Sequence, residues 1–426
     1  MPDYRETESL EDQLRTERRL AATHRMRKRV RWLLPLLLIV AVLAVLLFLL
    51  IRSIVNNKKK NVLPENVDAE ATVVFVGDIS MDSAMMEAFR TEAGFDFTPL
   101  FSSVTPQIFA ADLAVGNLEG NITDEDTLSD HNYPPQFLSA LAGCGFDVLQ
   151  TANSRSIDNG IAYIAKTKDA IAAAGMEAVG TFSSKEERDS CGGVLVRDVN
   201  GIRIAFIALT KSVNGKRIPE DAEYAVNLLY EDCYETGSTS YTKVDKDGIE
   251  TLISNAKAEK PDVIVALVHW GSEYEDVTEG QKQVAELLFD NGVDLIIGSH
   301  SHLVAGMQQE KEEGLPCSLS NGFVAYSLGD FLSGESNPTA HSGCILSIHL
   351  MKHDGKITVS DISYTPTYSA FPSQDLEQDQ YEIIDSTAAI TDFESDYYDK
   401  VSQPLYDMLK ASVEKLKERT GWGAEE

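Results

Sequence analysis

The chain places three histidines directly after apolar runs. His269 ends the run VIVALVH, and His300 and His302 end VDLIIGSHSH. A β-strand turns residues i and i+2 to the same face, so we expect His300 and His302 to point together at one ion. An isolated His-x-His pair is a weak signal, and this interpretation therefore needs partners elsewhere in the chain.

Carboxylates and an amide follow two other apolar runs. Asp78 ends TVVFVGD, and Asn117 and Glu119 lie in GNLEG. Taken singly, an Asp at a strand end more often caps a helix or forms a turn than binds a metal. If the runs are strands of one sheet, the carboxylates and histidines meet along one edge, in the crevice where open α/β sheets bind ligands. Oxygen and nitrogen ligands without thiolate suit Mn, Fe or Zn, and two such ions would activate a water for attack on phosphorus.

The elements that must position these residues alternate regularly. Buried strands are indicated by short apolar runs such as TVVFVGD, ADLAVGN, FDVLQ, RIAFIALT and FVAYSLGDF. Helical patterns such as IAYIAKTKDAIAAAG and GQKQVAELLFDNG lie between them, which predicts an α/β sheet with helices outside. GCILSIHLMKH and GKITVSDISYTPTY, joined by Asp-Gly, predict a β-hairpin that closes the sheet.

The N-terminal part predicts a membrane anchor. Residues 32–51, WLLPLLLIVAVLAVLLFLLI, carry no charge and at about 1.5 Å per residue can cross a hydrocarbon core of about 30 Å. The run is longer than that of a cleaved signal peptide and is not followed by small residues. We expect a single transmembrane helix at residues 32–52. Basic residues are denser before it than after it, so residues 1–31 are expected in the cytoplasm and the rest, after a linker at 53–70, outside.

Charge and cysteine content exclude other classes of site. The net charge of −30 disfavours nucleic-acid binding, because a phosphate backbone would be repelled. The five cysteines show no CxxC spacing, so a cysteine metal site is not expected, and any disulfide pairing stays open.

Several motifs together resemble one family. In chain order they are GD, NLEG, AN-x-x-x-x-D-x-G, HWGSEY, GSHSH and YSLGDF. They resemble the CapA family of capsule and poly-γ-glutamate synthesis proteins over roughly residues 72–335. That family is similar to calcineurin-like metallophosphoesterases. The resemblance implies an α/β fold, a four-layer α/β/β/α sandwich at residues 71–372, and one or two divalent metal ions. After this domain, composition and helical spacing predict an acidic helical tail at 373–426. Carried over by position, the metal-site residues would be Asp78, Glu119, His269, His300 and His302, with Asn117 and Asp158 supporting them.

One motif departs from the family pattern. The pattern ANNH-x-x-D-x-G stands here as ANSRSIDNG, in which Asn153 and Asp158 match. Ser154 replaces an Asn that by analogy gives an amide oxygen to a metal, and Arg155 replaces a His that gives a proton to the leaving group. Arg155 cannot be a general acid, because its pKa exceeds about 12, and its fixed charge disfavours a nearby metal. We therefore expect that one or both metals are lost.

The departure leaves two interpretations of Arg155 and three of the protein. Arg155 either pairs with Asp158 or holds a carboxylate or phosphate bidentately. The favoured function is a membrane-anchored extracellular accessory protein of capsule or poly-γ-glutamate synthesis, with polymer-synthase membrane subunits and an anionic surface polymer as partners. The alternatives are an active metal-dependent hydrolase in which His131 or a water replaces the missing acid, and a surface receptor or adhesion domain.

Overall fold

The apolar runs form the strands of two large sheets. The computed structural model describes residues 68–124, 128–234, 242–309, 322–395 and 401–422. The chain divides into two units, 1–65 and 66–426, and all described residues belong to the second. The expected membrane helix at residues 32–52 therefore lies outside the described residues. Within the described ranges, no helix combines the length and apolar character needed to cross a membrane.

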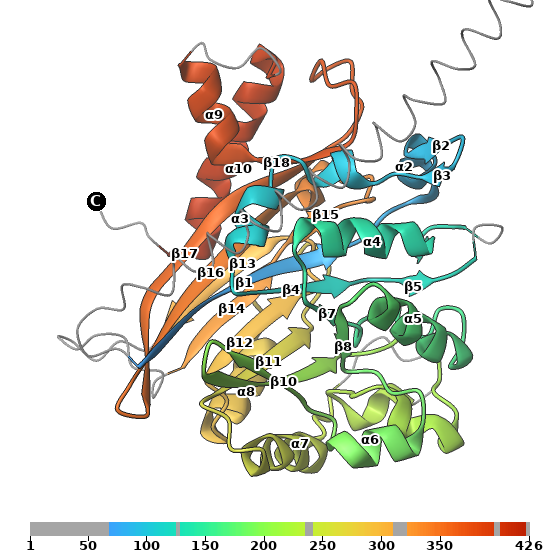
Figure 1. Cartoon of the computed structure of the whole chain (residues 1–426), viewed down its shortest axis with the longest axis vertical. Helices are drawn as coiled ribbons and strands as arrows, with labels where there is room; N and C mark the ends of the chain where they lie inside the picture. The colour runs from blue at the N-terminus through green and yellow to red at the C-terminus, as the bar shows by residue number, and fades with distance from the viewer. Residues whose placement is uncertain (1–67, 125–127, 235–241, 310–321, 396–400, 423–426) are drawn as a thin grey trace, which may run out of the picture. The chain divides into compact units, whose positions relative to one another are not determined.

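The first sheet runs in the order β18-β17-β16-β1-β4-β7-β8, and β15 also pairs with β1 (Figure 1). Strands β1, β4, β7 and β8 are parallel to one another, whereas β16, β17 and β18 join β1 through antiparallel pairs. The strands are β1 (Ala69–Ile79), β4 (Leu113–Leu118), β7 (Val148–Gln150), β8 (Glu177–Val179), β15 (Asp330–Leu332), β16 (Ser342–His353), β17 (Lys356–Ala370) and β18 (Glu382–Asp385).

The second sheet runs in the order β13-β14-β12-β11-β10-β9. Its central strands are parallel, and β9 and β13 pair antiparallel at its edges. The strands are β9 (Leu195–Val199), β10 (Ile202–Thr210), β11 (Val263–His269), β12 (Leu295–Ser299), β13 (Val304–Gln309) and β14 (Phe323–Leu328). Two short pairs complete the strands: β2 (Arg90–Thr91) with β3 (Gly94–Phe95), and β5 (Asn121–Ile122) with β6 (Asn132–Tyr133).

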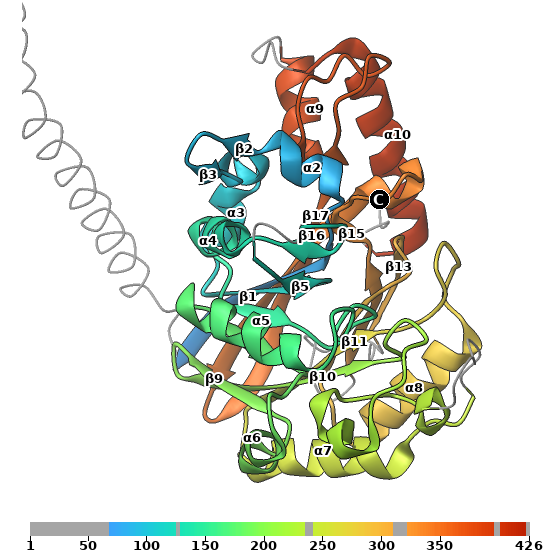
Figure 2. The ribbon, with the colours of Figure 1, turned by 90° about the vertical axis from the view of Figure 1, so that its right-hand side faces the viewer.

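Helices cover the outer faces of both sheets (Figures 1 and 2). The α-helices are α2 (Ser83–Ala88), α3 (Thr105–Ala110), α4 (Pro135–Cys144), α5 (Ala162–Ala173), α6 (Lys185–Cys191), α7 (Lys246–Ala258), α8 (Glu279–Asp290), α9 (Ser386–Glu394) and α10 (Gln403–Thr420). Short 3-10 helices are η1 (Thr98–Phe101), η3 (Glu220–Ala225), η4 (Glu231–Tyr234) and η6 (Pro338–His341).

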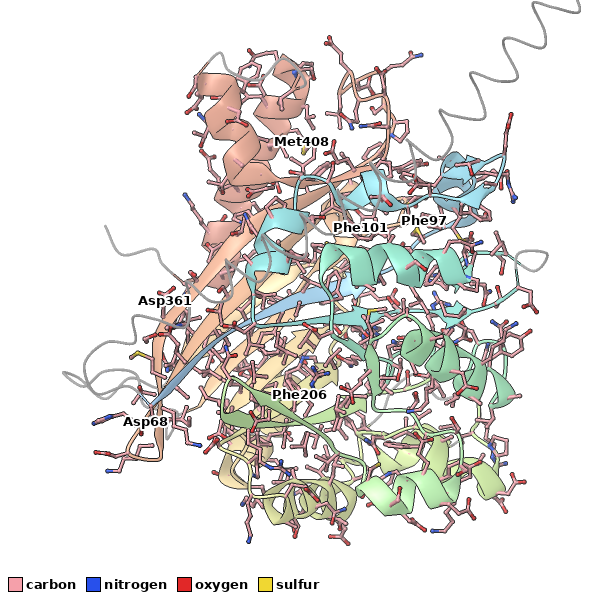
Figure 3. All side chains as sticks on the ribbon, in the orientation of Figure 1. Asp68, Phe97, Phe101, Phe206, Asp361 and Met408 are labelled. Atoms are coloured by element: carbon pink, nitrogen blue, oxygen red, sulfur yellow. The ribbon has the colours of Figure 1, made fainter. Side chains whose placement is uncertain are left out.

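Side-chain alternation along the strands builds four layers. On β1, Phe75 faces a core shared with Phe206 of β10, whereas Val74 faces a second core shared with Phe137 of α4. On β10, Ile207 faces a third core that also holds residues of α7 and α8. Figure 3 labels Phe206 in the layer between the sheets. Each sheet therefore buries both faces, one against the other sheet and one against helices, which is an α/β/β/α sandwich.

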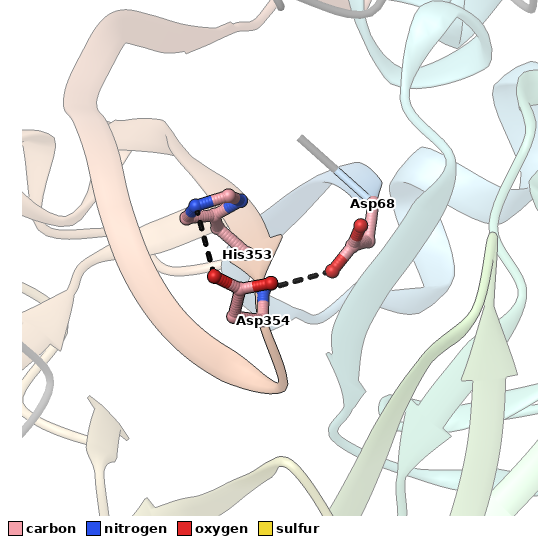
Figure 4. A group of neighbouring side chains, drawn as sticks. All are labelled: Asp68, His353 and Asp354. Carbon is pink, nitrogen blue, oxygen red and sulfur yellow. Dashed lines mark hydrogen bonds and ion pairs between the residues drawn. The ribbon is translucent and has the colours of Figure 1, made fainter. Parts of the chain in front are cut away.

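The Asp-Gly dipeptide does form the expected hairpin. Asp354 and Gly355 have φ of 49° and 73° and join β16 to β17, as a tight hairpin turn requires. The carboxylate of Asp68 accepts a hydrogen bond from the Asp354 backbone N–H (2.8 Å), and His353 Nε2 lies 3.4 Å from the Asp354 carboxylate (Figure 4). Asp68, the residue directly before β1, thus holds the hairpin turn in place.

The chain after β17 adds to the sandwich. Strand β18 pairs with the end of β17, and α9 and α10 pack against these strands (Figure 1). Leu405 and Leu409 of α10 are buried in a fourth apolar cluster together with Tyr368 of β17. Trp422 donates from its indole N–H to the Ile362 carbonyl (3.1 Å).

Candidate metal centre

The candidate site residues gather where parallel strands of both sheets end. Asp78 pairs with Asn117 of β4 and with Asp330 of β15, and His269 at the end of β11 pairs with Ser299 at the end of β12. Parallel strands that end side by side bring their last residues to one edge. The buried side chains at this edge, each at most 7% exposed, are Asp78, Asn117, Glu119, Asn153, His269, His300 and His302.

Asp78, His302 and Asp330 form a buried group of three metal-binding donors. His302 Nδ1 lies 3.0 and 3.1 Å from the two carboxylate oxygens of Asp330, and each of the three residues offers a donor atom within 4.8 Å of the others. Protein ligands bind Zn²⁺ at about 2.0–2.2 Å, so neighbouring ligand atoms of a tetrahedral ion lie about 3.4 Å apart. The donor atoms must therefore draw closer together to hold one divalent ion. Its oxygen and nitrogen donors suit Mn, Fe or Zn.

Sequence reasoning missed Asp330. The signal was present, because Gly329-Asp330 follows the apolar run FVAYSL as Gly77-Asp78 follows TVVFV. The structure pairs the two dipeptides: the Asp78 N–H donates to the Gly329 carbonyl (3.1 Å). Gly77 lies so close to this carbonyl that a Cβ atom would meet its oxygen at 1.8 Å. The absence of a side chain at Gly77 therefore lets the two backbones approach closely enough to bring the two carboxylates together.

The expectation that His300 and His302 share one strand face is wrong. Strand β12 ends at Ser299, and the two histidines lie in the following loop with φ of 98° and 59°. Their rings are 6.5 Å apart and have different partners. His302 contacts Asp330 and stacks on Tyr274, with ring centroids 5.1 Å apart. The tight turn after the strand overrides the strand's side-chain alternation.

His300 instead joins His269 and Ser154. His300 Nδ1 lies 3.1 Å from His269 Nε2, and Ser154 Oγ lies 2.9 Å from His269 Nε2 and 3.4 Å from His300 Nδ1. Ser154 therefore reaches the histidine pair despite its short side chain. Glu119 lies on this side as well, with Oε1 3.6 Å from His269 Nε2. Among the described residues, His269, His300 and Glu119 do not converge as a three-donor group.

Two amides hold the cluster in place. The Asn117 amide donates to the Asp78 carboxylate, and the Asn153 amide donates to Asn117 Oδ1 (2.9 Å) and to the Leu118 carbonyl (2.8 Å). The His300 backbone N–H donates to Asp78 Oδ2 (2.9 Å). Asp78 is therefore fixed from two sides before any ligand binds. Asn117 and Asn153 act here as supports for the donor groups.

Burial and neighbouring charges separate the protonation states of the cluster. Burial opposes the charge on His302, but Asp330 outweighs it and raises the pKa of His302 to about 10. Burial raises the pKa of Asp78, but His269 and hydrogen bonds more than offset this, so the pKa lies below its ordinary value. Burial and Asp78 raise the pKa of Glu119 well above its usual range, and burial and His269 lower the pKa of His300 well below it. Burial therefore favours the neutral forms of Glu119 and His300, whereas Asp330 favours the charged form of His302.

Arg155 lies beside this cluster and lines a pocket of about 280 Å³. Arg155 NH1 lies 3.4 Å from Asp158 Oδ2, and Lys216 Nζ lies 2.8 Å from Asp158 Oδ1. Asp158 is therefore shared between two cations. Arg155 lines the pocket with Glu119, His131, Ser154, His300 and His302. The expected pairing with Asp158 is present, and it leaves Arg155 facing the pocket.

The fold and the site define an α/β/β/α protein with a candidate metal centre at the edge of two packed sheets. The family described as "Bacterial capsule synthesis protein PGA_cap" matches residues 72–335, more than half of the chain. The chain belongs to this family. The match ends just beyond Asp330, so it contains every donor residue described above.

Two relatives of similar sequence are named as CapA proteins of PGA or capsule biosynthesis. The chain is 27% identical over 297 residues to "PGA biosynthesis protein CapA" of Bacillus subtilis (strain 168), covering 68% of this chain and 70% of the relative. It is 27% identical over 291 residues to "Capsule biosynthesis protein CapA" of Bacillus anthracis, covering 66% of this chain and 64% of the relative. The match thus spans about two thirds of each relative.

Two solved structures are similar to this chain with lower sequence identity. One is a phosphatase of Mycoplasma pneumoniae, with a TM-score of 0.39 and 14% identity over 70% of this chain and 93% of that one. The other is the calcineurin-like phosphoesterase YfkN of Bacillus subtilis, with a TM-score of 0.36 and 13% identity over 82% of this chain and 98% of that one. TM-scores this low do not by themselves establish a common fold.

Proposed function

We propose that this chain is a membrane-anchored, extracellular protein of capsule or poly-γ-glutamate synthesis that binds one divalent metal ion and has reduced or lost phosphoesterase chemistry. Membership in the capsule synthesis family supports the role in polymer synthesis, and the apolar run at residues 32–51 supports the anchor. The proposal includes contact with membrane subunits of a polymer synthase and with an anionic polymer at the cell surface.

The observation that carries the reduced chemistry is the arrangement at Ser154 and Arg155. The Ser154 hydroxyl lies between His269 and His300, where the calcineurin-like pattern would supply an amide oxygen to a second metal. A neutral hydroxyl is a weaker ligand than a carboxylate, an imidazole or an amide oxygen. Arg155 adds a permanent positive charge beside the same place, which opposes a second cation.

The complete donor group supports one metal. Asp78, His302 and Asp330 would hold the ion, while Asn117 orients Asp78 and Ser333 Oγ donates to Asp330 (2.9 Å). A bound divalent ion would act there as a Lewis acid toward an oxygen of the ligand. Arg155 cannot give a proton to a leaving group, so the residues on this side orient a ligand more readily than they complete a hydrolysis.

The test is metal content and hydrolysis of the full-length chain in detergent, beside the variant S154N/R155H. We expect about one metal per native chain, about two in the variant, and cleavage of a chromogenic phosphodiester only in the variant. A native chain that holds two metals and turns over the phosphodiester would overturn the reduced chemistry. Loss of surface polymer in a deletion strain, restored by the native gene, tests the biological role separately. Retained polymer would favour a surface receptor instead.

The second candidate function is that of an active hydrolase. It is favoured by the position of His131, which could replace the missing proton donor. His131 lines the pocket, and its Nδ1 lies 3.1 Å from Ser80 Oγ. Burial and then Arg155 lower the pKa of His131, so little of it is protonated at neutral pH. This hypothesis therefore predicts that hydrolysis rises as the pH falls below neutrality and that H131Q removes it. A flat pH profile in this range would count against His131 as the acid.

A further inference from the structure

The side chain of Arg155 is incompletely paired for a partly buried guanidinium. Its Nε is buried and, within the described part of the chain, has no hydrogen-bond partner. Its contact with Asp158 is long, at 3.4 Å, and Asp158 has a closer cation in Lys216 at 2.8 Å. A guanidinium presents five donors in a planar fork that matches two oxygens of a carboxylate or phosphate. Arg155 thus retains donors for an anion.

A second basic group lines the same pocket. Lys211 donates to the Gly271 carbonyl, and no carboxylate lies within ion-pair distance of its amine among the described residues. Burial lowers the pKa of Lys211, so a nearby anion would stabilise its charged form. Arg155 and Lys211 therefore provide positive charge inside an acidic protein.

Two other carboxylates restrict the ligand. Glu273 and Glu335 also line the pocket, and Glu335 accepts a hydrogen bond from the Tyr274 hydroxyl (3.1 Å). These acceptors would repel a second negative charge but would accept hydrogen bonds from N–H or O–H groups. A volume of about 280 Å³ holds a small group, since a water takes about 30 Å³ of liquid.

We propose that Arg155, assisted by Lys211, binds the oxyanionic end group of a ligand whose adjoining atoms carry N–H or O–H groups, and that it does so without a metal. The end group is a carboxylate or a phosphate. The inference rests on the proposed function in taking this site as one that binds rather than hydrolyses. The inference also explains how an acidic protein could bind an anionic polymer. The net charge of −30 repels a polyanion, whereas the guanidinium of Arg155 attracts a single anionic end group.

The experiment is calorimetric titration of the full-length chain in detergent with EDTA present. Glycerol 3-phosphate and glycerate serve as matched probes that differ in the anionic group, and glycerol is the uncharged control. We expect one of the two anions to bind and glycerol not to bind. The preferred probe identifies the phosphate or the carboxylate as the end group. Absence of binding by both anions, or binding that requires added metal, overturns the proposal.

Variants separate the guanidinium from general charge. R155Q is expected to lower affinity about tenfold to a hundredfold, as loss of charged hydrogen bonds does, and R155K to lower it less, because an ammonium cannot bind two oxygens in parallel. R217Q is the matched control. Arg217 is exposed, pairs with Glu220 at 3.1 Å and does not line the pocket, so its loss should change affinity less than about twofold.

The outcomes distinguish this inference from the proposed function. If R155Q binds as tightly as the native chain, or if R217Q weakens binding as much as R155Q does, the inference fails. R155K keeps the charge and the approximate size, so it remains informative should R155Q fold poorly. A deletion strain that keeps its polymer would refute the proposed role in polymer synthesis while leaving oxyanion binding intact. A strain that loses its polymer, with a purified chain that binds neither anion, would support that role and refute oxyanion binding.

Discussion

The contact between Gly77 and Gly329 predicts that Gly77→Ala damages the fold and the metal centre together. The new Cβ atom would lie 1.8 Å from the Gly329 carbonyl oxygen and 3.0 Å from its carbonyl carbon. Both atoms belong to the backbone, so no side-chain rotation relieves the clash. Moving the oxygen to 3.0 Å requires β1 and the chain entering β15 to separate by at least 1.2 Å, which is 3.0 Å minus 1.8 Å.

The magnitude follows from two losses. Overpacking that forces a backbone shift costs about 1–3 kcal/mol, and the hydrogen bond from the Asp78 N–H to the Gly329 carbonyl contributes about 0.5–1.5 kcal/mol. We therefore expect a destabilisation of about 1.5–4.5 kcal/mol, the sum of the two. The same shift separates Asp78 from Asp330, whose Cα atoms are paired. It exceeds the tolerance of about 0.2 Å for metal ligands, so metal affinity should fall at least about tenfold.

Urea unfolding followed by circular dichroism, and metal titration of the folded variant, measure the two effects. Gly143→Ala is the matched control: Gly143 lies within α4, and a Cβ atom there would meet nothing within 4 Å. An Ala at this helical position should stabilise the protein by about 0.5–1 kcal/mol. If Gly77→Ala unfolds at the native urea concentration and binds metal as tightly as the native chain, the close approach does not position the two carboxylates.

Three further predictions concern single side chains. Asp330→Asn should remove most metal binding and leave His302 without its anionic partner, measured by metal content of the purified chain; unchanged content would exclude Asp330 as a ligand. Burial raises the pKa of Asp294 to about 6, partly offset by the Ile264 N–H. Its pKa in the folded state then exceeds the unfolded value of about 3.9, so the folded state binds more protons between these two pH values. The free energy of unfolding therefore falls by up to about 3 kcal/mol as the pH rises from about 4 to 6. Asp294→Asn should flatten this dependence in urea unfolding at several pH values; an unchanged slope would contradict the assignment. Leu409→Ala should cost about 2–5 kcal/mol, because Leu409 is fully buried beside β17; limited proteolysis that finds α10 as resistant as before would refute its docking.

Local patterns in the chain determined most of the fold. Runs such as RIAFIALT and DVIVALVH are long, apolar and rich in β-branched residues, and they became β10 and β11. Their side chains alternate between two cores, which is why no polar face interrupts the run. Helices α5 and α8 follow from apolar positions at helical spacing, and the hairpin after β16 follows from Asp354 and Gly355. The capsule synthesis family was likewise recognisable from short motifs in their order along the chain.

Part of the candidate site was also visible in the sequence. Asp78, Asn117 and His269 follow apolar runs, and parallel strands must bring such residues to a common edge. The structure has this arrangement: Asp78 pairs with Asn117, and His269 pairs with Ser299. Ser154 and Arg155 were also recognisable as candidate site residues, because they depart from an otherwise matching motif.

Tertiary structure alone decided which donors meet. His300 and His302 are two residues apart, yet backbone turns with positive φ send one to His269 and the other to Asp330. Asp330 joins Asp78 because Gly77 lets its backbone approach that of Gly329 closely, although the two aspartates are far apart in the chain. Alternation and helical spacing are local properties that a short stretch of sequence carries. The meeting of side chains from distant strands depends on sheet register and on how the two sheets pack, and no single stretch carries that information.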